Sequence, residues 1–91
     1  MVLFIIKESL LSGEPSMIKY LNPQDKVLLI QDGVLILNKG ELGIRIFKEK
    51  GIEVLALKED LELRGIQNNT DVKLIDYPGF LELIENEKVF S

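Results

Sequence analysis

The chain contains neither cysteine nor histidine among its 91 residues. Without a thiol it has no disulfide framework, no cysteine zinc site and no thiol chemistry of its own. Without an imidazole its serines lack the base that a Ser–His–Asp triad requires. We therefore expect a protein that is not an enzyme, with no catalytic residues.

Three further absences narrow the function. No apolar run approaches the roughly 18 residues of a membrane span. The first residues, MVLFII, have no basic leader or cleavage site and are followed at once by Lys7 and Glu8, so a cytoplasmic location is expected. Neither G-x-G-x-x-G nor G-x-x-x-x-G-K-[ST] occurs, which removes the usual support for a phosphate-containing cofactor. We expect no cofactor.

The charge balance argues against direct binding of nucleic acid. The chain has 11 basic and 15 acidic residues, for a net charge of −4. Nucleic-acid-binding proteins usually carry a basic surplus or a basic stripe. The most basic segment runs from Lys39 to Lys50 and is interrupted by Glu41 and Glu49, so it is interpreted as a solvated surface.

The chain has the length and composition of one folded domain over residues 1–91. Hydrophobic residues make up 46% and charged residues 29%, as in ordinary globular proteins. Four continuous apolar runs, without alternation, suit strands buried on both faces. They are Val2–Ile6, Val27–Ile30, Val54–Leu57 and Val72–Ile75. The connections between them are long enough for helices, which predicts a three-layer α/β domain of βαβαβαβα order with a four-stranded, mainly parallel sheet.

The first two connections carry different signals. The first predicts a helix with Met17, Ile18 and Leu21 on its inward side. The second predicts a short turn near Asn38–Gly40, after which Gly43–Phe47 is compatible with a helix or a strand.

The later connections are clearer. Lys58–Arg64 is predicted to be a helix that Gly65 ends, and the last helix begins near Pro78. Asp32 and Asp60 stand where helices start, so we expect their carboxylates to accept unpaired backbone N–H groups there.

Polar residues follow the predicted strands and should gather at one edge of the sheet, where ligands of open α/β sheets usually bind. They are Lys7, Glu8, Ser9, Gln31, Asp32, Gly33, Lys58, Glu59, Asp60, Asp76 and Tyr77. Asp32, Asp60 and Asp76 have the oxygen ligands that Mg²⁺ prefers. Because the helix macrodipole alone favours acidic residues at these positions, we expect no metal site.

Four consecutive apolar residues, Val34 to Leu37, follow Asp32-Gly33. Successive positions of an α-helix point about 100° apart, so these side chains would face nearly every direction. One side would pack on the sheet and the other would need a partner, which makes Val34, Leu35 and Leu37 candidate interface residues. The alternative is that the segment Phe47–Gly51 folds back and covers them.

Three segments of the chain resemble the TusB/DsrH family of sulfur-relay proteins. The first contains Leu29, Gln31, Asp32, Gly33 and Val34. The second contains Ala56, Leu57, Glu59, Asp60, Leu61, Arg64 and Gly65, and resembles the pattern A-L-x-E-D-L-x-x-R-G. The third contains Ile75, Asp76, Tyr77, Phe80 and Leu83, and resembles the ending I-D-Y-x-x-F-x-x-L. Their order and spacing agree, so the resemblance spans nearly the whole chain.

The resemblance implies a DsrE-like α/β fold and a place beside sister subunits of the TusC and TusD type, or their DsrF and DsrE counterparts. In that complex sulfur passes as a persulfide toward 2-thiolation of the wobble uridine of certain tRNAs, or through sulfur oxidation. The relay cysteine belongs to the TusD-type sister. Some DsrH-type members carry a cysteine in the first connection, and this chain has none, which fits a non-catalytic TusB-like subunit.

Two other functions stay open at this point. One is a stand-alone, homodimeric module that binds a small ligand or regulates another process through the acidic edge of the sheet. The other is an enzyme with carboxylate chemistry, for which no acid–base pair can be assigned from spacing.

Overall fold

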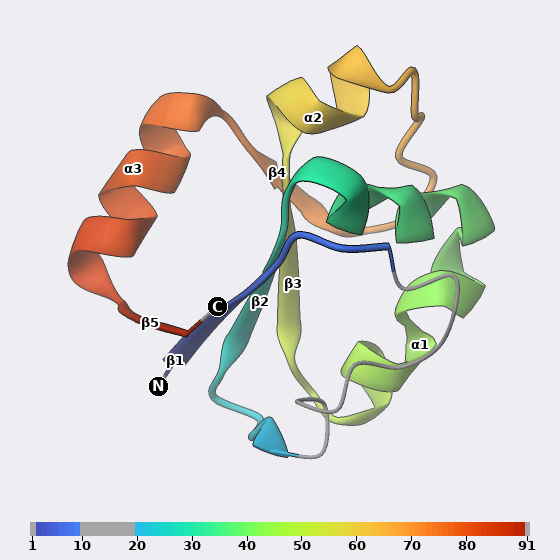
Figure 1. Cartoon of the computed structure of the whole chain (residues 1–91). Coiled ribbons are helices and arrows are strands. Elements are labelled where there is room, and N and C mark those ends of the chain that lie inside the picture. The colour runs from blue at the N-terminus through green and yellow to red at the C-terminus, as the bar shows by residue number, and fades with distance from the viewer. Residues whose placement is uncertain (1, 10–19, 91) are drawn as a thin grey trace.

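Parallel strands form the sheet of the computed structural model, which describes residues 2–9 and 20–90 (Figure 1). The strands are β1 (Val2–Ile6), β2 (Lys26–Leu29), β3 (Glu53–Leu57), β4 (Lys73–Ile75) and β5 (Lys88–Phe90). They lie in the order β4-β3-β2-β1-β5, and every neighbouring pair is parallel. The α/β fold with a parallel sheet is confirmed.

The sheet has one strand more than the sequence predicted. The segment after the last helix forms β5, which pairs with β1 through Leu3 and Val89. At three residues, the first of them a lysine, β5 is too short to stand out as an apolar run. The partner strand lies at the other end of the chain, so no local signal reports the pairing.

The helices match the sequence more closely. They are the 3₁₀ helix η2 (Gln31–Lys39), α1 (Glu41–Glu49), α2 (Lys58–Leu63) and α3 (Tyr77–Asn86). The predicted break falls at Gly40, between η2 and α1. The strand alternative for Gly43–Phe47 is wrong, because Ile44 and Phe47 are buried at the three-residue spacing of one helical face.

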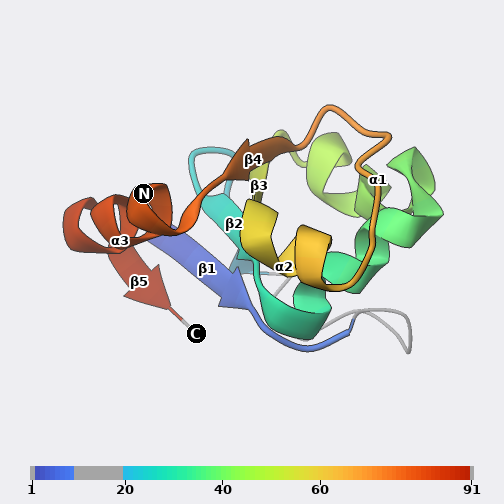
Figure 2. The ribbon, with the colours of Figure 1, turned by 90° about the horizontal axis from the view of Figure 1, so that it is seen from above.

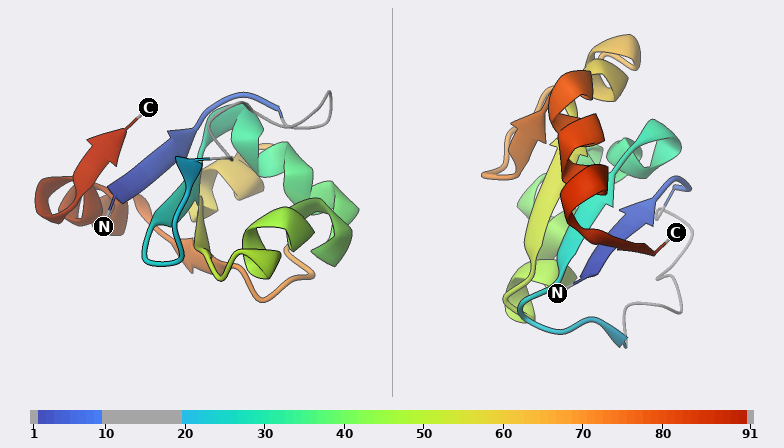
Figure 3. Two further views of the ribbon diagram at one scale, coloured as in Figure 1. Left: turned by 90° about the horizontal axis from the view of Figure 1, so that it is seen from below. Right: turned by 90° about the vertical axis from the view of Figure 1, so that its left-hand side faces the viewer.

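The helices lie on the two faces of the sheet in unequal numbers. Figures 2 and 3 show η2, α1 and α2 on one side and α3 alone on the other. The chain adds β2, β3 and β4 in one direction and then returns across the sheet to β5. Right-handed crossovers place the helices of the outward run on one face and the helix of the return on the opposite face.

The larger core lies under η2, α1 and α2. Its centre includes Leu29, Val34 and Phe47, each fully buried. Ile36 and Leu37 are also buried, and Leu35 packs partly against the same cluster. The expectation that these candidate interface residues face outward is therefore wrong for Val34 and Leu37, while Leu35 is partly buried. In a 3₁₀ helix residues three apart eclipse each other, so Val34 and Leu37 both point into the core.

The smaller core lies under α3. Four strand residues and Ile30, which follows β2, are buried there; the strand residues are Leu3, Leu28, Leu55 and Leu57. Phe80, Leu83 and Ile84 of α3 cover them, yet no residue of α3 is itself buried. This face is thus closed by a single helix whose own side chains stay partly in solvent.

The start of β2 is tied to β1 by Asp25, which is buried. Its carboxylate accepts the N–H groups of Val2 and Asn22, at 3.0 and 2.9 Å, so the buried charge has hydrogen-bond partners. Leu21 is buried as predicted, whereas Met17 and Ile18 lie outside the described residues.

Candidate functional site at the carboxyl edge of the sheet

Gln31 makes the turn from β2 into η2. Its φ of 50° is in the left-handed region, which non-glycine residues rarely adopt. Its N–H donates to Oδ2 of Asp60 at 2.6 Å, across 29 residues of sequence. Because the carboxylate satisfies this N–H, Asp60 holds the unusual backbone of Gln31 in place.

Gly33 lies against the end of β1. A Cβ atom at this position would collide with the carbonyl oxygen of Ile6, which already accepts the N–H of Ile30 at 3.0 Å. The close approach of two backbones requires glycine here. The sequence Gln31-Asp32-Gly33 therefore encodes the junction of β1, β2 and η2.

Arg64 joins the second and third connections. Its guanidinium lies 3.2 Å from Oδ1 of Asp32 and 3.4 Å from Oδ1 of Asp60. It also reaches the carbonyl of Asp60 at 3.4 Å, near the end of α2, where a cation is favoured. Gly65 follows with a φ of 64°, the left-handed conformation that ends helices. We name Gln31, Asp32, Asp60 and Arg64 the carboxyl-edge network.

The prediction that Asp32 and Asp60 cap their own helices is wrong. The N-cap residues of η2 and α2 are Ile30 and Leu57, and neither helix has a side-chain cap. Both carboxylates lie in the first turn and bind across the edge instead. The sequence cannot distinguish these roles, because an acidic residue in the first turn is favourable in either case.

The start of α3 joins the edge through two other acidic residues. Asp76 caps α3, since its Oδ1 accepts the N–H of Gly79 at 3.0 Å. Oε2 of Glu59 accepts the N–H of Tyr77, also at 3.0 Å. Glu59 thereby fixes the start of α3 to α2. Sequence spacing missed this cross-link, although both residues belong to the segments that carry the family resemblance.

The sequence-predicted site residues separate into three groups by exposure. Gln31, Asp32, Glu59, Gly65, Asp76 and Tyr77 are exposed; Leu35, Asp60 and Arg64 are intermediate; Gly33, Val34 and Leu37 are buried. The structure brings the polar members together at one edge and puts Val34 and Leu37 in the core. The candidate site is therefore the polar edge rather than the apolar run.

This edge is suited to holding the chain's own connections. Across residues 2–9 and 20–90, the acidic side chains form no group of three that could enclose a metal ion. The carboxylates of Asp32, Asp60, Asp76 and Glu59 each have a partner within the chain.

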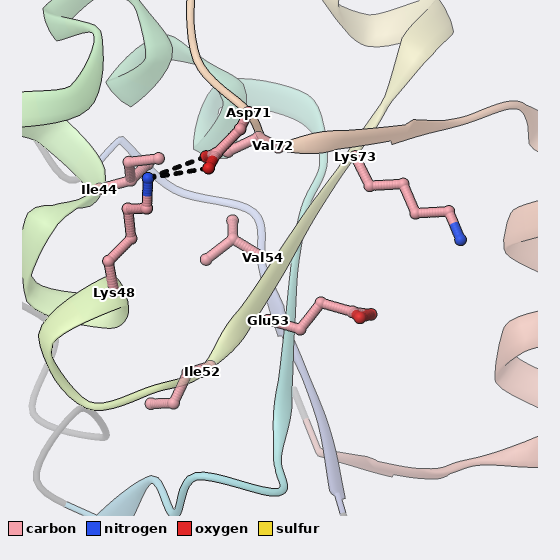
Figure 4. Close-up of a pocket in the computed structure, with 8 residues that line it drawn as sticks. All are labelled: Ile44, Lys48, Ile52, Glu53, Val54, Asp71, Val72 and Lys73. Carbon is pink, nitrogen blue, oxygen red and sulfur yellow. Dashed lines mark hydrogen bonds and ion pairs between the residues drawn. The ribbon is translucent and has the colours of Figure 1, made fainter.

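A second candidate is a hollow at the opposite edge of the sheet, with a volume of about 280 Å³ (Figure 4). Its floor is apolar, and its rim is closed by Lys48, whose Nζ lies 2.8 Å from Glu41 and 3.0 Å from Asp71. The hydrogen bonds that Lys48 donates to Glu41 and, next in effect, to Asp71 raise the pKa of Lys48. The ammonium of Lys48 already has carboxylate partners. Its ion pair with Asp71 holds the segment before β4 against α1.

Comparisons with known proteins give a consistent result. The family model of DsrH-like proteins matches residues 12–89. A protein named Protein TusB from Enterobacter sp. (strain 638) is 38% identical over 69 residues, which cover 74% of this chain and 73% of that protein. A Protein TusB from Salmonella dublin is 35% identical over 71 residues, covering 76% and 75%. Among the helices of the described residues, none is long and apolar enough to cross a membrane.

Proposed function

Since the chain belongs to the family of DsrH-like proteins, we propose that it is a non-catalytic subunit of a sulfur-relay complex that supports 2-thiolation of the wobble uridine of tRNA. The observation that carries the proposal is the family match combined with the lack of cysteine. A persulfide forms on a cysteine thiolate, and methionine has no ionisable S–H to replace it. Sulfur must then be carried by another chain.

The partners in this proposal are cysteine-bearing sister subunits of the TusD or DsrE type, together with a TusC- or DsrF-like subunit, in the cytoplasm. The lack of thiol and imidazole groups leaves the chain one kind of contribution, which is to shape or stabilise a site on a partner. The net charge of −4 supports contact with these proteins rather than with the tRNA itself.

The carboxyl-edge network supports this role by making the surface rigid. It fixes the ends of β1, β2 and β3 relative to one another, and Glu59 adds the start of α3. A partner that binds beside this edge meets a preorganised surface and loses less entropy on binding. We propose that the exposed residues Asp32, Glu59 and Tyr77 border the contact.

The test is a reconstituted relay with a cysteine desulfurase, radiolabelled cysteine, both sister subunits and the substrate tRNA. We expect persulfide label on the cysteine-bearing sister and none on this chain. Omitting this chain should lower tRNA thiolation, and adding it back should restore the rate. Full thiolation without it would contradict the proposal and favour the stand-alone homodimeric module.

A further inference from the structure

The outer face of α3 combines exposed apolar and acidic side chains. It consists of Pro78, Leu81, Glu82 and Glu85, which lie away from the residues that cover the sheet, and of Tyr77 at one side of the helix. The ring of Tyr77 also packs against that of Phe80, with 5.8 Å between the ring centroids. Tyr77 is 52% exposed and Leu81 41% exposed. They are four residues apart and hence adjacent on the helix surface. Figure 3 shows that none of the other helices of the described residues covers α3 from outside.

The helix together with its two capping residues, Asp76 and Glu87, has a charge equal to the net charge of the whole chain. Four acidic residues lie in the segment 76–87, which has no lysine or arginine, and the remaining 11 acidic residues equal the 11 basic ones. Asp76 caps the helix and Glu87 pairs with Lys26 at 2.9 Å. Among the ion pairs of the described residues, none involves Glu82 or Glu85.

The positions of Glu82 and Glu85 are unfavourable for the helix alone. Glu85 lies in the last turn of α3, where the macrodipole favours cations and disfavours a carboxylate, and that turn has no basic residue. Like charges three residues apart also repel each other. Local rules that a sequence breaks without internal compensation are characteristic of functional surfaces.

From this arrangement we propose that the outer face of α3 is a docking surface for a protein partner whose contact combines an apolar strip with lysine or arginine side chains. Basic side chains opposite Glu82 and Glu85 would remove both unfavourable interactions, while the strip would cover Tyr77 and Leu81. Where the partner is a sister subunit of the relay, this inference rests on the proposed function.

The same charges argue against other occupants. A second copy related by a two-fold axis would place the same acidic face on both sides of the contact, where the carboxylates repel. Nucleic acid would bring phosphates against Glu82 and Glu85. The surface is thus suited to a different protein.

A first experiment does not depend on the relay. Backbone amide resonances of the full chain are followed by NMR during titration with a helical peptide that has one leucine face and one lysine face. We expect shift changes centred on 77–86, and affinity about tenfold lower for Glu82→Lys/Glu85→Lys. The matched control is Glu49→Lys/Glu62→Lys, which changes the net charge equally on α1 and α2 and should stay within about twofold of wild type. A corresponding leucine–glutamate peptide should not bind.

Shift changes spread evenly over the acidic surface, or equal losses in both double variants, would overturn the inference. A second experiment measures binding of the co-purified sister subunits to the same variants and to Leu81→Ala, with exposed Leu42→Ala on α1 as the control. Loss confined to the α3 variants supports the inference. Sister binding that no α3 variant weakens contradicts it and leaves the proposed function standing. Peptide binding on α3 without any sister binding supports the surface and refutes the relay role.

Discussion

The two faces of the sheet are built with very different amounts of covering structure. On one face η2, α1 and α2 bury a continuous core that includes Phe47, Val34 and Leu29. On the other face α3 is the one helix of the described residues that covers the buried side chains of four strand residues and Ile30, and none of its own residues is buried. The first face therefore provides most of the packing, and the second leaves a helix available for contact. In a small domain with little core, this division places stability and binding on opposite sides.

The largest expected difference between the faces is in core truncation. Phe47→Ala should lower the free energy of unfolding by about 3–5 kcal/mol, because a fully buried aromatic ring leaves a cavity. Leu83→Ala on α3 should cost about 1–2 kcal/mol, since that side chain is only partly buried. Urea denaturation of both variants measures this. Equal losses would mean that α3 is packed as firmly as the other helices.

A glycine on each side gives a second contrast. Gly33→Ala should destabilise the chain by about 2–3 kcal/mol, because the new Cβ meets the backbone carbonyl of Ile6. At Gly79 in α3 the new Cβ would lie 3.1 Å from Oδ1 of Asp76, an exposed side chain that can move. Helix propensity then offsets the crowding, so Gly79→Ala should change stability by less than about 1 kcal/mol. Thermal unfolding of both variants measures these changes in stability. A mild effect of Gly33→Ala would refute the close approach of Gly33 to the backbone of Ile6.

Within the carboxyl-edge network, Asp60 should matter more than Asp32. Asp60→Ala leaves the N–H of Gln31 without its acceptor and should cost about 1–3 kcal/mol. Asp32 is 63% exposed and contacts Arg64 alone among the described residues, so Asp32→Ala should cost less than about 1 kcal/mol. Chemical denaturation of the two variants and of the double variant shows which substitution lowers the free energy of unfolding more. A larger loss at Asp32 would show that the ion pair with Arg64 is the stronger restraint.

The smallest expected effect belongs to the ion pair that fastens the end of α3. The hydrogen bond that Lys26 donates to Glu87, aided by the charges of Glu87 and Glu53, raises the pKa of Lys26 above its usual value of 10.5. A raised lysine pKa adds stability that is complete below pH 10.5 and is lost as the pH rises through the folded-state value. Lys26→Met should therefore cost about 0.2–1 kcal/mol at neutral pH and less in strong alkali. Urea midpoints measured across that range test the sign, and a cost that grows with pH would contradict it.

The sequence predicted most of the fold because the relevant signals are local. Continuous apolar runs located β1 to β4, and Gly65 and Pro78 located the ends of α2 and the start of α3. It missed β5, whose pairing with β1 spans almost the whole chain. It also put Leu37 on the surface, because an α-helical period was applied to a segment that is a 3₁₀ helix.

The site was predicted in its residues but not in its contacts. The polar residues after each strand do gather at one edge, as parallel strands require. The bond from Gln31 to Asp60 and the bond from Tyr77 to Glu59 join separate connections, so no spacing rule reports them. The free face of α3 escaped notice for a similar reason. Its apolar residues indicated a packed helix, and the exposure of Tyr77 and Leu81 depends on tertiary structure.

The most direct test of the contrast between the two faces is hydrogen–deuterium exchange of the chain, alone and with its sister subunits. In the free chain we expect slow exchange in α1 and faster exchange in α3, because α3 has no buried residue. In the complex the gain in protection should fall on α3, with little change in η2 and α1. Protection gained over η2 and α1, with α3 unchanged, would contradict the account.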